Sequence, residues 1–226
     1  MKRRINIALI VCLLSPFLGF AQPKQNLVQF NFTEVWVWEY TDSLNKKNEM
    51  AIYREPNFNY WLLTNEAFGQ SDEMSVWFLL KQNGEIIQAY QDGESNDSIQ
   101  LMKYNLQFNN KTKLPTNWKA TGNTKNFGDV SLGFPKFIGK EYKVSYSKTN
   151  KFSVFYLGTT KADFTMLTLF NELNIDAKLL VRFPKNIPAN YIVMSEQTKF
   201  LNDSIQYNFK YISNAEYYVS FVEDVN

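Results

Sequence analysis

Several acidic side chains of this chain lie in segments predicted to be loops, where paired carboxylates could do acid–base chemistry. Glu66, Asp72 and Glu73 lie between two apolar segments, and Asp92 and Glu94 follow a third. Two carboxylates held about 5 to 9.5 Å apart can hydrolyse a glycosidic bond, one as the acid and the other as nucleophile or base. Acidic loop residues more commonly cap turns or meet water. A carboxylate-based glycoside hydrolase is therefore kept as an alternative hypothesis.

The segment DGESNDS, residues 92–98, has the alternating oxygen donors of a calcium-binding loop. These candidate donors are Asp92, Glu94, Asn96 and Ser98. The match ends there, because an EF-hand has glycine at position six and a bidentate glutamate at position twelve, where this chain has Asp97 and Lys103. From this pattern we expect a polar hairpin turn and no bound metal or cofactor.

The composition excludes most other catalytic chemistry. The chain has no histidine, and its one cysteine, Cys12, lies in the N-terminal apolar run. If this run is removed, triads with histidine, cysteine nucleophiles and zinc sites built from histidine or cysteine are all excluded. No glycine-rich phosphate loop or dinucleotide-binding fingerprint is present. We predict that the protein is not an enzyme.

The stretch EVWVWEYTDS places Trp36, Trp38 and Tyr40 on every second residue. On a strand these rings share one face at a spacing of about 7 Å, which suits stacking against sugars or bases. Val35 and Val37 make the opposite face apolar too, and such a strand is typically buried on both sides. We therefore expect a core. The candidate binding residues are Trp36, Trp38, Tyr40, Trp61 and Trp77.

These residues must be positioned by strands, because alternation with period two dominates the chain. Tyr142, Val144 and Tyr146 alternate with polar residues, and the pattern resumes at residues 152–156, which predicts a β-hairpin. Turn residues, Ser213-Asn214 among them, separate the other runs. Those runs are residues 50–54, 60–64, 74–80, 85–91, 191–199, 204–212 and 216–222.

The fold class that follows is mainly β: an antiparallel sandwich or an incompletely closed barrel, with at most one or two short helices. Residues 162–174 fit both helical and strand spacing, and we expect a short helix there. Residues 109–140 are rich in Gly, Asn, Thr, Lys and Pro and predict a linker or a long loop. Residues 22–226 then form a single β-rich domain, or two halves, 22–108 and 141–226.

The N-terminus has the pattern of a signal peptide. Three basic residues, Lys2 to Arg4, precede an apolar run over residues 5–20, and small residues suit cleavage between Ala21 and Gln22. Removing residues 1–21 leaves 21 basic against 22 acidic side chains, so the formal charge falls from +2 to −1. We expect an exported protein, periplasmic or extracellular in a Gram-negative envelope, with no membrane span in the mature form and no nucleic-acid partner.

Three tripeptides, Asp42-Ser43-Leu44, Asp97-Ser98-Ile99 and Asp203-Ser204-Ile205, occur beside predicted loops. They resemble the short motif that general O-glycosylation systems of Bacteroidota use on exported proteins. This resemblance covers the tripeptides and the leader and not a fold family. It implies Ser43, Ser98 and Ser204 as candidate O-glycosylation sites.

The favoured function is a non-catalytic binding or structural role in the envelope, with a small molecule, a glycan or an envelope protein as partner. The warrant is the shortage of catalytic groups together with the surplus of aromatic residues. A half-open barrel that carries a lipid or another apolar ligand is a second hypothesis, with Trp36, Trp38, Trp61 and Trp77 as its lining.

Overall fold

The structure is a computed structural model of the 226-residue chain. It describes residues 25–41, 46–68, 76–91, 99–107, 113–134, 136–145, 152–170, 173, 179–184, 187–198 and 206–224. The strands are β1 (Gln25–Thr41), β2 (Lys47–Glu55), β3 (Tyr60–Leu63), β4 (Val76–Leu80), β5 (Glu85–Gln91), β6 (Ile99–Asn105), β7 (Trp118–Phe127), β8 (Phe137–Ser145), β9 (Phe152–Thr159), β10 (Tyr191–Thr198) and β11 (Gln206–Asp224). The helical elements are α2 (Thr165–Phe170) and the short 3-10 helices η2 (Asn65–Phe68) and η3 (Val130–Leu132).

Across the described residues the strands form one sheet in the order β6-β5-β4-β3-β2-β1-β11-β10-β9-β8-β7. Neighbours pair antiparallel, so each half of the chain is a meander that runs outward from the centre. The outermost strands, β6 and β7, are not paired with each other, so the sheet is not closed. The predicted antiparallel β fold, incompletely closed and with little helix, is confirmed.

The chain divides into two compact units. Unit 1 is Met1–Phe30 with Tyr218–Asn226, and its described part consists of the outer ends of β1 and β11. Within it the rings of Phe30 and Phe221 stack with their centroids 5.9 Å apart. Unit 2, Asn31–Tyr217, contains the other strands, α2 and the principal core.

The strands of unit 2 are buried on both faces near the middle of the sheet. The inner face, defined here as the one that carries Trp36 and Trp38, pairs these residues with Ile52 and Met50 on β2, and all four side chains are buried. On the opposite, outer face, further apolar side chains are buried as well: Val37, Leu62, Leu79 and Ile87. The predicted two-sided burial of these strands is confirmed, since alternate residues of one strand point to opposite faces.

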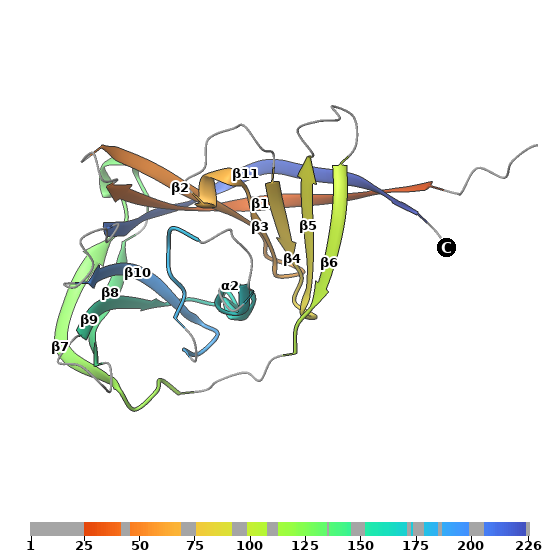
Figure 1. The fold of residues 1–226 in the computed structure, drawn as a ribbon. Coiled ribbons are helices and arrows are strands. Elements are labelled where there is room, and N and C mark those ends of the chain that lie inside the picture. Colours follow the sequence, from red (N-terminus) through yellow and green to blue (C-terminus); the bar gives the residue numbers. More distant parts are fainter. Residues whose placement is uncertain are drawn as a thin grey trace, which may run out of the picture. The chain divides into compact units, whose positions relative to one another are not determined.

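Between β9 and β10 the structure describes residues 160–170, 173, 179–184 and 187–190, and we call these residues the covering segment. The segment includes α2, and Figure 1 shows the strands of unit 2 curving around this helix. The helix begins after Asp163, whose carboxylate Oδ1 accepts the backbone N–H of Thr165 at 2.8 Å, as an N-terminal capping residue does. Its apolar residues Met166, Leu167 and Phe170 are buried. The predicted short helix is confirmed.

Two features of the sheet were not predicted. Residues 118–127 form strand β7 within the segment expected to be a linker or long loop, and between Trp118 and Phe127 its side chains are exposed. An exposed polar edge strand carries no apolar alternation, so its sequence resembles a loop. The turn expected at Ser213-Asn214 was wrong, because β11 continues through it. The turn preference of serine and asparagine is a local one, and the pairing of β11 within the sheet overrides it.

The hairpin of β7 and β8 contacts β11 through its tip, of which residues 128–134 and 136 are described. The backbone N–H of Asp129 donates to the carbonyl oxygen of Lys210 at 2.8 Å. The ring of Phe134 stacks on Tyr211 with centroids 4.3 Å apart. This tip therefore packs one end of the curved sheet against the central strand β11.

Candidate functional site

The aromatic residues nominated from the sequence lie in or beside the core. Trp36, Trp38 and Trp61 are buried, Tyr40 packs against the core, and Trp77 is half-buried. The first three come from β1 and β3 and share the inner face of the sheet. The core interpretation of this aromatic row is confirmed by that burial.

The inner-face rings are in direct contact with the covering segment. Trp36 packs edge-on against Phe164, with the ring centroids 5.3 Å apart. Trp36 also packs edge-on against Trp61, at a centroid distance of 5.8 Å. Trp61 also lies 4.8 Å from Phe164. Further along the strand, Trp38 packs edge-on against Phe183 at 6.1 Å. These are the edge-to-face and tilted geometries that aromatic pairs prefer in a core.

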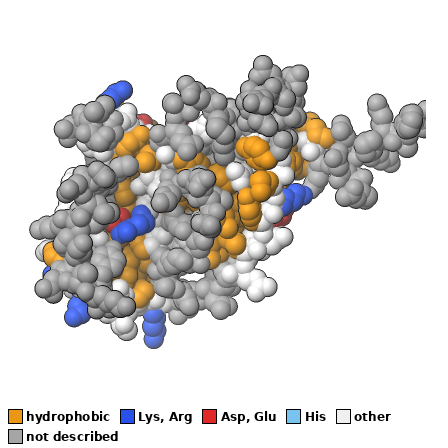
Figure 2. Space-filling view, in the orientation of Figure 1, with side chains coloured by type: hydrophobic (Ala, Val, Ile, Leu, Met, Phe, Trp, Pro, Cys, Tyr) orange, Lys and Arg blue, Asp and Glu red, His pale blue; other side chains and the backbone are white. Residues whose placement is uncertain are grey.

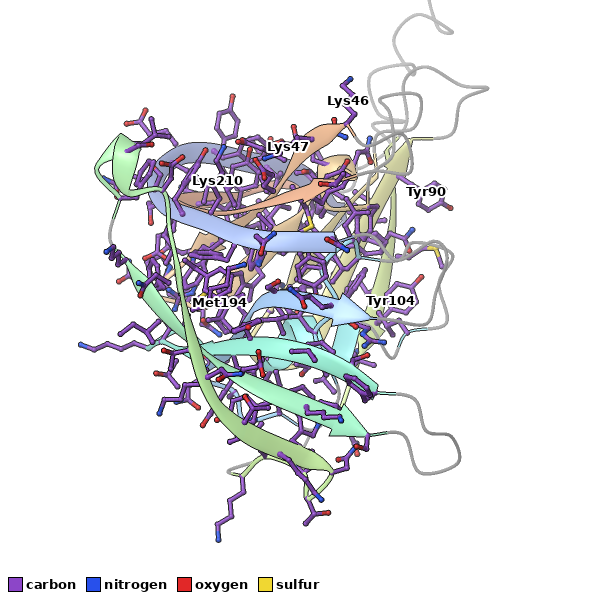
Figure 3. All side chains as sticks on the ribbon, turned by 90° about the vertical axis from the view of Figure 1, so that its left-hand side faces the viewer. Lys46, Lys47, Tyr90, Tyr104, Met194 and Lys210 are labelled. Carbon is purple, nitrogen blue, oxygen red and sulfur yellow. The ribbon has the colours of Figure 1, made fainter. Side chains whose placement is uncertain are left out.

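The indole N–H groups of this row are also occupied by the protein. Trp38 donates to the carbonyl oxygen of Val193 at 2.9 Å, beside the irregularity in β10 between Val193 and Ser195. Trp61 donates to the carbonyl oxygen of Asp163 at 2.9 Å. The next residue of β10, Met194, is fully buried and lies among the interior side chains in Figure 3. The polar edges of the rings thus hold the covering segment and β10 in place.

A charged group enters the inner face where the covering segment begins; we call Glu34, Arg54, Asn59 and Asp163 the Arg54 cluster. Arg54 pairs with Glu34 at 2.9 Å, and its Nε and Nη2 donate to the side-chain oxygen of Asn59 at 3.1 and 3.0 Å. Asn59 in turn donates to the Asp163 carbonyl oxygen at 3.0 Å. Asn59 has a φ of 51°, a left-handed conformation that asparagine tolerates better than most residues. The cluster therefore ties the β2–β3 turn to the start of α2.

A second group of polar side chains, Arg182, Glu196 and Tyr207, links the C-terminal part of the covering segment to β10 and β11. Arg182 forms an ion pair with Glu196 of β10, and the hydroxyl of Tyr207 donates to the same carboxylate at 3.1 Å. Tyr207 is buried. Burial first, and then the negative charge of Glu196, raise the pKa of Tyr207 well above its usual value of 10.

This raised pKa predicts a loss of stability in alkali. Above pH 10 the unfolded chain releases the Tyr207 proton while the folded chain retains it, so the folded state is favoured less as the pH rises. One such proton gives a slope of about 1.4 kcal/mol per pH unit. Urea midpoints measured between about pH 9 and 11 should fall less steeply for Tyr207→Phe than for the wild type. Equal slopes for the two proteins would contradict this assignment.

On the exposed surface, the carboxylate of Glu141 accepts three hydrogen bonds. Tyr156 donates at 2.5 Å, Thr121 at 2.7 Å and Asn123 at 3.0 Å. These bonds lower the pKa of Glu141, with the Tyr156 bond as the largest cause, and the same bond raises the pKa of Tyr156. Thr121 and Asn123 lie at the register shift in β7, between Ala120 and Thr124. The Glu141 carboxylate therefore stabilises that irregularity.

Most of the other nominated residues lie outside the described part of the chain. These are Asp72, Glu73, Asp92, Glu94, Asn96, Ser98, Ser43, Ser204, Ala21 and Gln22. Glu66 is described and is exposed on η2. Among the described residues, no group of three or more acidic, histidine or cysteine side chains is arranged to hold a metal ion. Within the same residues, no helix has the length and apolar character needed to cross a bilayer.

A group of partly exposed rings, which we call the Tyr53 row, was not predicted from the sequence: Tyr53, Phe58, Tyr60 and Tyr217. Tyr53 stacks on Tyr217 with centroids 4.4 Å apart, and Phe58 stacks on Tyr60 at 5.5 Å. Burial, and then the charge of nearby Glu66, raise the pKa of both Tyr53 and Tyr217. The signal in the sequence is the pair of rings Phe58 and Tyr60, which follow the turn-forming residues Pro56 and Asn57, because a ring beside a turn is commonly exposed.

Hydrophobic side chains also reach the surface at the β6 edge. Figure 2 shows them gathered over β5 and β6, where Met102 is exposed. The Tyr104 hydroxyl donates to the side-chain oxygen of Gln88 at 2.9 Å on the same face.

No protein-family model, curated protein or solved structure is significantly similar to this chain.

Proposed function

We propose that this is an exported protein of a Gram-negative envelope with a non-catalytic binding or structural role. The observation that carries the proposal is the occupation of the inner face by the chain itself. Phe164 and Phe183 of the covering segment pack directly on Trp36, Trp61 and Trp38. Because the inner-face rings pack against the chain itself, they stabilise the fold. We therefore expect any ligand to bind on the outer surface of the molecule.

The same packing argues against the apolar-ligand carrier. A carrier needs an internal cavity of several hundred Å³ lined by its apolar residues. Here three of the four rings nominated to line it, Trp36, Trp38 and Trp61, contact one another or the covering segment at centroid distances of 4.8 to 6.1 Å. The unclosed sheet is the feature that favours a carrier. Binding of an apolar ligand on the inner face would require the covering segment to move away from that face.

The buried polar groups also support a structural rather than a catalytic interior. Glu55 accepts hydrogen bonds from Asn57 and Thr33, and Glu196 is held by Arg182 and Tyr207. A carboxylate pair for glycoside hydrolysis needs one acid and one base that face a shared substrate. Both of these carboxylates face protein donors, which gives each of them a structural partner.

Export rests on the basic and apolar leader that precedes Gln22. The same leader supports Ser43, Ser98 and Ser204 as glycosylation sites, since such modification follows export. The mature chain would start at Gln22, and each occupied serine would add the mass of one glycan.

Native mass spectrometry of the protein purified from its own envelope tests the proposal. We expect a chain that begins at Gln22, carries no stoichiometric apolar guest, and releases no sugar product from oligosaccharides incubated with it. One lipid retained per chain would replace the proposal with the carrier. Turnover of an oligosaccharide would replace it with the hydrolase, and a mass that includes residues 1–21 would remove the export argument.

A further inference from the structure

We propose that the Tyr53 row binds a neutral linear glycan. The inference rests on the proposed function, because it assigns a ligand class to the non-catalytic binding role. It depends on rings that the core does not use: Phe58 is 61% exposed and Tyr217 is 38% exposed. Tyr53 and Tyr60 are half-buried and fix these two rings in place by stacking.

The register of β2 and β3 makes the four rings continuous. Tyr53 pairs with Leu62 and Glu55 pairs with Tyr60, so Tyr53 and Tyr60 are diagonal neighbours on the outer face. Diagonal neighbours lie about 7 to 8 Å apart, which is within reach of aromatic side chains. With Tyr217 stacked on one of them and Phe58 stacked on the other, the row runs from β11 to the β2–β3 turn.

The chemistry of the row fits a sugar chain better than a purely apolar ligand. The flat carbon–hydrogen faces of sugars pack on aromatic rings, while their hydroxyl groups require hydrogen-bond donors and acceptors at the rim. Tyr53 and Tyr217 each carry a hydroxyl that can donate or accept. The carboxylate of Glu66, close enough for its charge to act on Tyr53 and Tyr217, supplies acceptors.

The negative charge of Glu66 favours a neutral glycan over an anionic one. Glu66 is exposed and repels an anionic sugar from this end of the row. Glu55 lies beneath the row on the same face, but its oxygens already accept hydrogen bonds from Asn57 and Thr33. A neutral chain gains the ring contacts and the Glu66 acceptors without this repulsion, so the expected ligand carries no carboxylate or sulfate.

The experiment is calorimetric titration of the full mature chain with cellohexaose, xylohexaose, maltohexaose and oligogalacturonate of similar length. We expect at least one neutral sugar to bind with a Kd of about 0.1 to 1 mM, and oligogalacturonate to bind more weakly. Glu66→Gln should narrow the gap between the neutral and the anionic sugar. Phe58→Ala and Tyr217→Ala should each weaken binding about tenfold.

Matched controls separate the row from general surface effects. Tyr218 is adjacent to Tyr217 and points to the other side of β11, and Ile138 is as exposed as Phe58. Tyr218→Ala and Ile138→Ala should leave the Kd unchanged. Circular dichroism should show that all four variants keep the wild-type fold, since each removes an exposed side chain.

Three results would overturn the inference. The first is no binding of any neutral sugar at about 5 mM. The second is binding that survives both Phe58→Ala and Tyr217→Ala. The third is a change of oligomeric state in these variants without any effect on sugar binding, which would make the row a contact between copies of the chain. Cleavage of a bound sugar is a separate result: it refutes the non-catalytic function while leaving the binding row in place.

Discussion

Trp61→Ala is expected to lower the free energy of unfolding by about 3 to 5 kcal/mol, the range for removing a large buried aromatic side chain. Trp61 is fully buried on β3 and packs against Trp36 and Phe164. The substitution also removes the hydrogen bond to Asp163 and the ring beneath the Arg54 guanidinium, which lies 5.4 Å from its centroid. Urea unfolding followed by far-UV circular dichroism measures the loss as a lower midpoint.

Two variants separate the causes of the Trp61 effect. Trp61→Phe keeps a ring but loses the N–H and part of the volume, and we expect it to cost less than half as much as Trp61→Ala. Ile138→Ala on β8 removes an exposed side chain and should change stability by less than about 0.5 kcal/mol. If Trp61→Ala cost no more than this control, the contacts of Trp61 with the covering segment would not stabilise the fold.

Arg54→Met is expected to cost about 2 to 3 kcal/mol, because it leaves buried partners without their cation. The Arg54 side chain is 10% exposed, and the Glu34 side chain is 28% exposed, which keeps the loss below that of a fully buried pair. Methionine preserves the length and much of the packing of the arginine stem. The lost interactions are the ion pair to Glu34, two hydrogen bonds to Asn59 and the contact over Trp61.

A double-mutant cycle measures how much of the stability lost in Arg54→Met is due to the ion pair between Arg54 and Glu34. Glu34→Gln alone should be mildly destabilising, and the Arg54→Met/Glu34→Gln double variant should be more stable than the sum of the single losses predicts. Independent, additive losses would show that Arg54 stabilises the turn through Asn59 and packing alone. The matched pair Lys47 and Glu39, at the exposed end of the same strands, should show a coupling of at most about 1 kcal/mol.

The sequence was sufficient to predict most of the sheet, because alternation is visible wherever a strand has at least one buried face. The hairpin predicted from Tyr142 to Tyr156 is formed by β8 and β9, and β2, β3 and β5 start within a few residues of the predicted runs. β7 was missed because its exposed residues have no apolar partners to alternate with. The continuous β11 was missed because its path through Ser213 depends on the neighbouring strand and not on local turn propensity.

The sites were harder to predict than the sheet. The tryptophans of EVWVWEY were correctly assigned to the core, since a strand that is apolar on both faces is seldom exposed. Their contacts with Phe164 and Phe183 join residues that are more than a hundred positions apart in the sequence, and no local pattern contains that information. The Tyr53 row joins β2, β3 and β11, so its continuity depends on register and on contacts between distant segments.

The central place of β1 and β11 in the sheet has a consequence for how the molecule is assembled. These two strands are neighbours although they lie at opposite ends of the sequence, whereas every other neighbouring pair is consecutive along the chain. Consecutive strands form short-range contacts quickly, while a contact that spans nearly the whole chain has a large closure entropy and forms slowly. Because a chain is synthesised from its N-terminus, the β1–β11 pair can form only after β11 has been made, so we expect this central pair to form last.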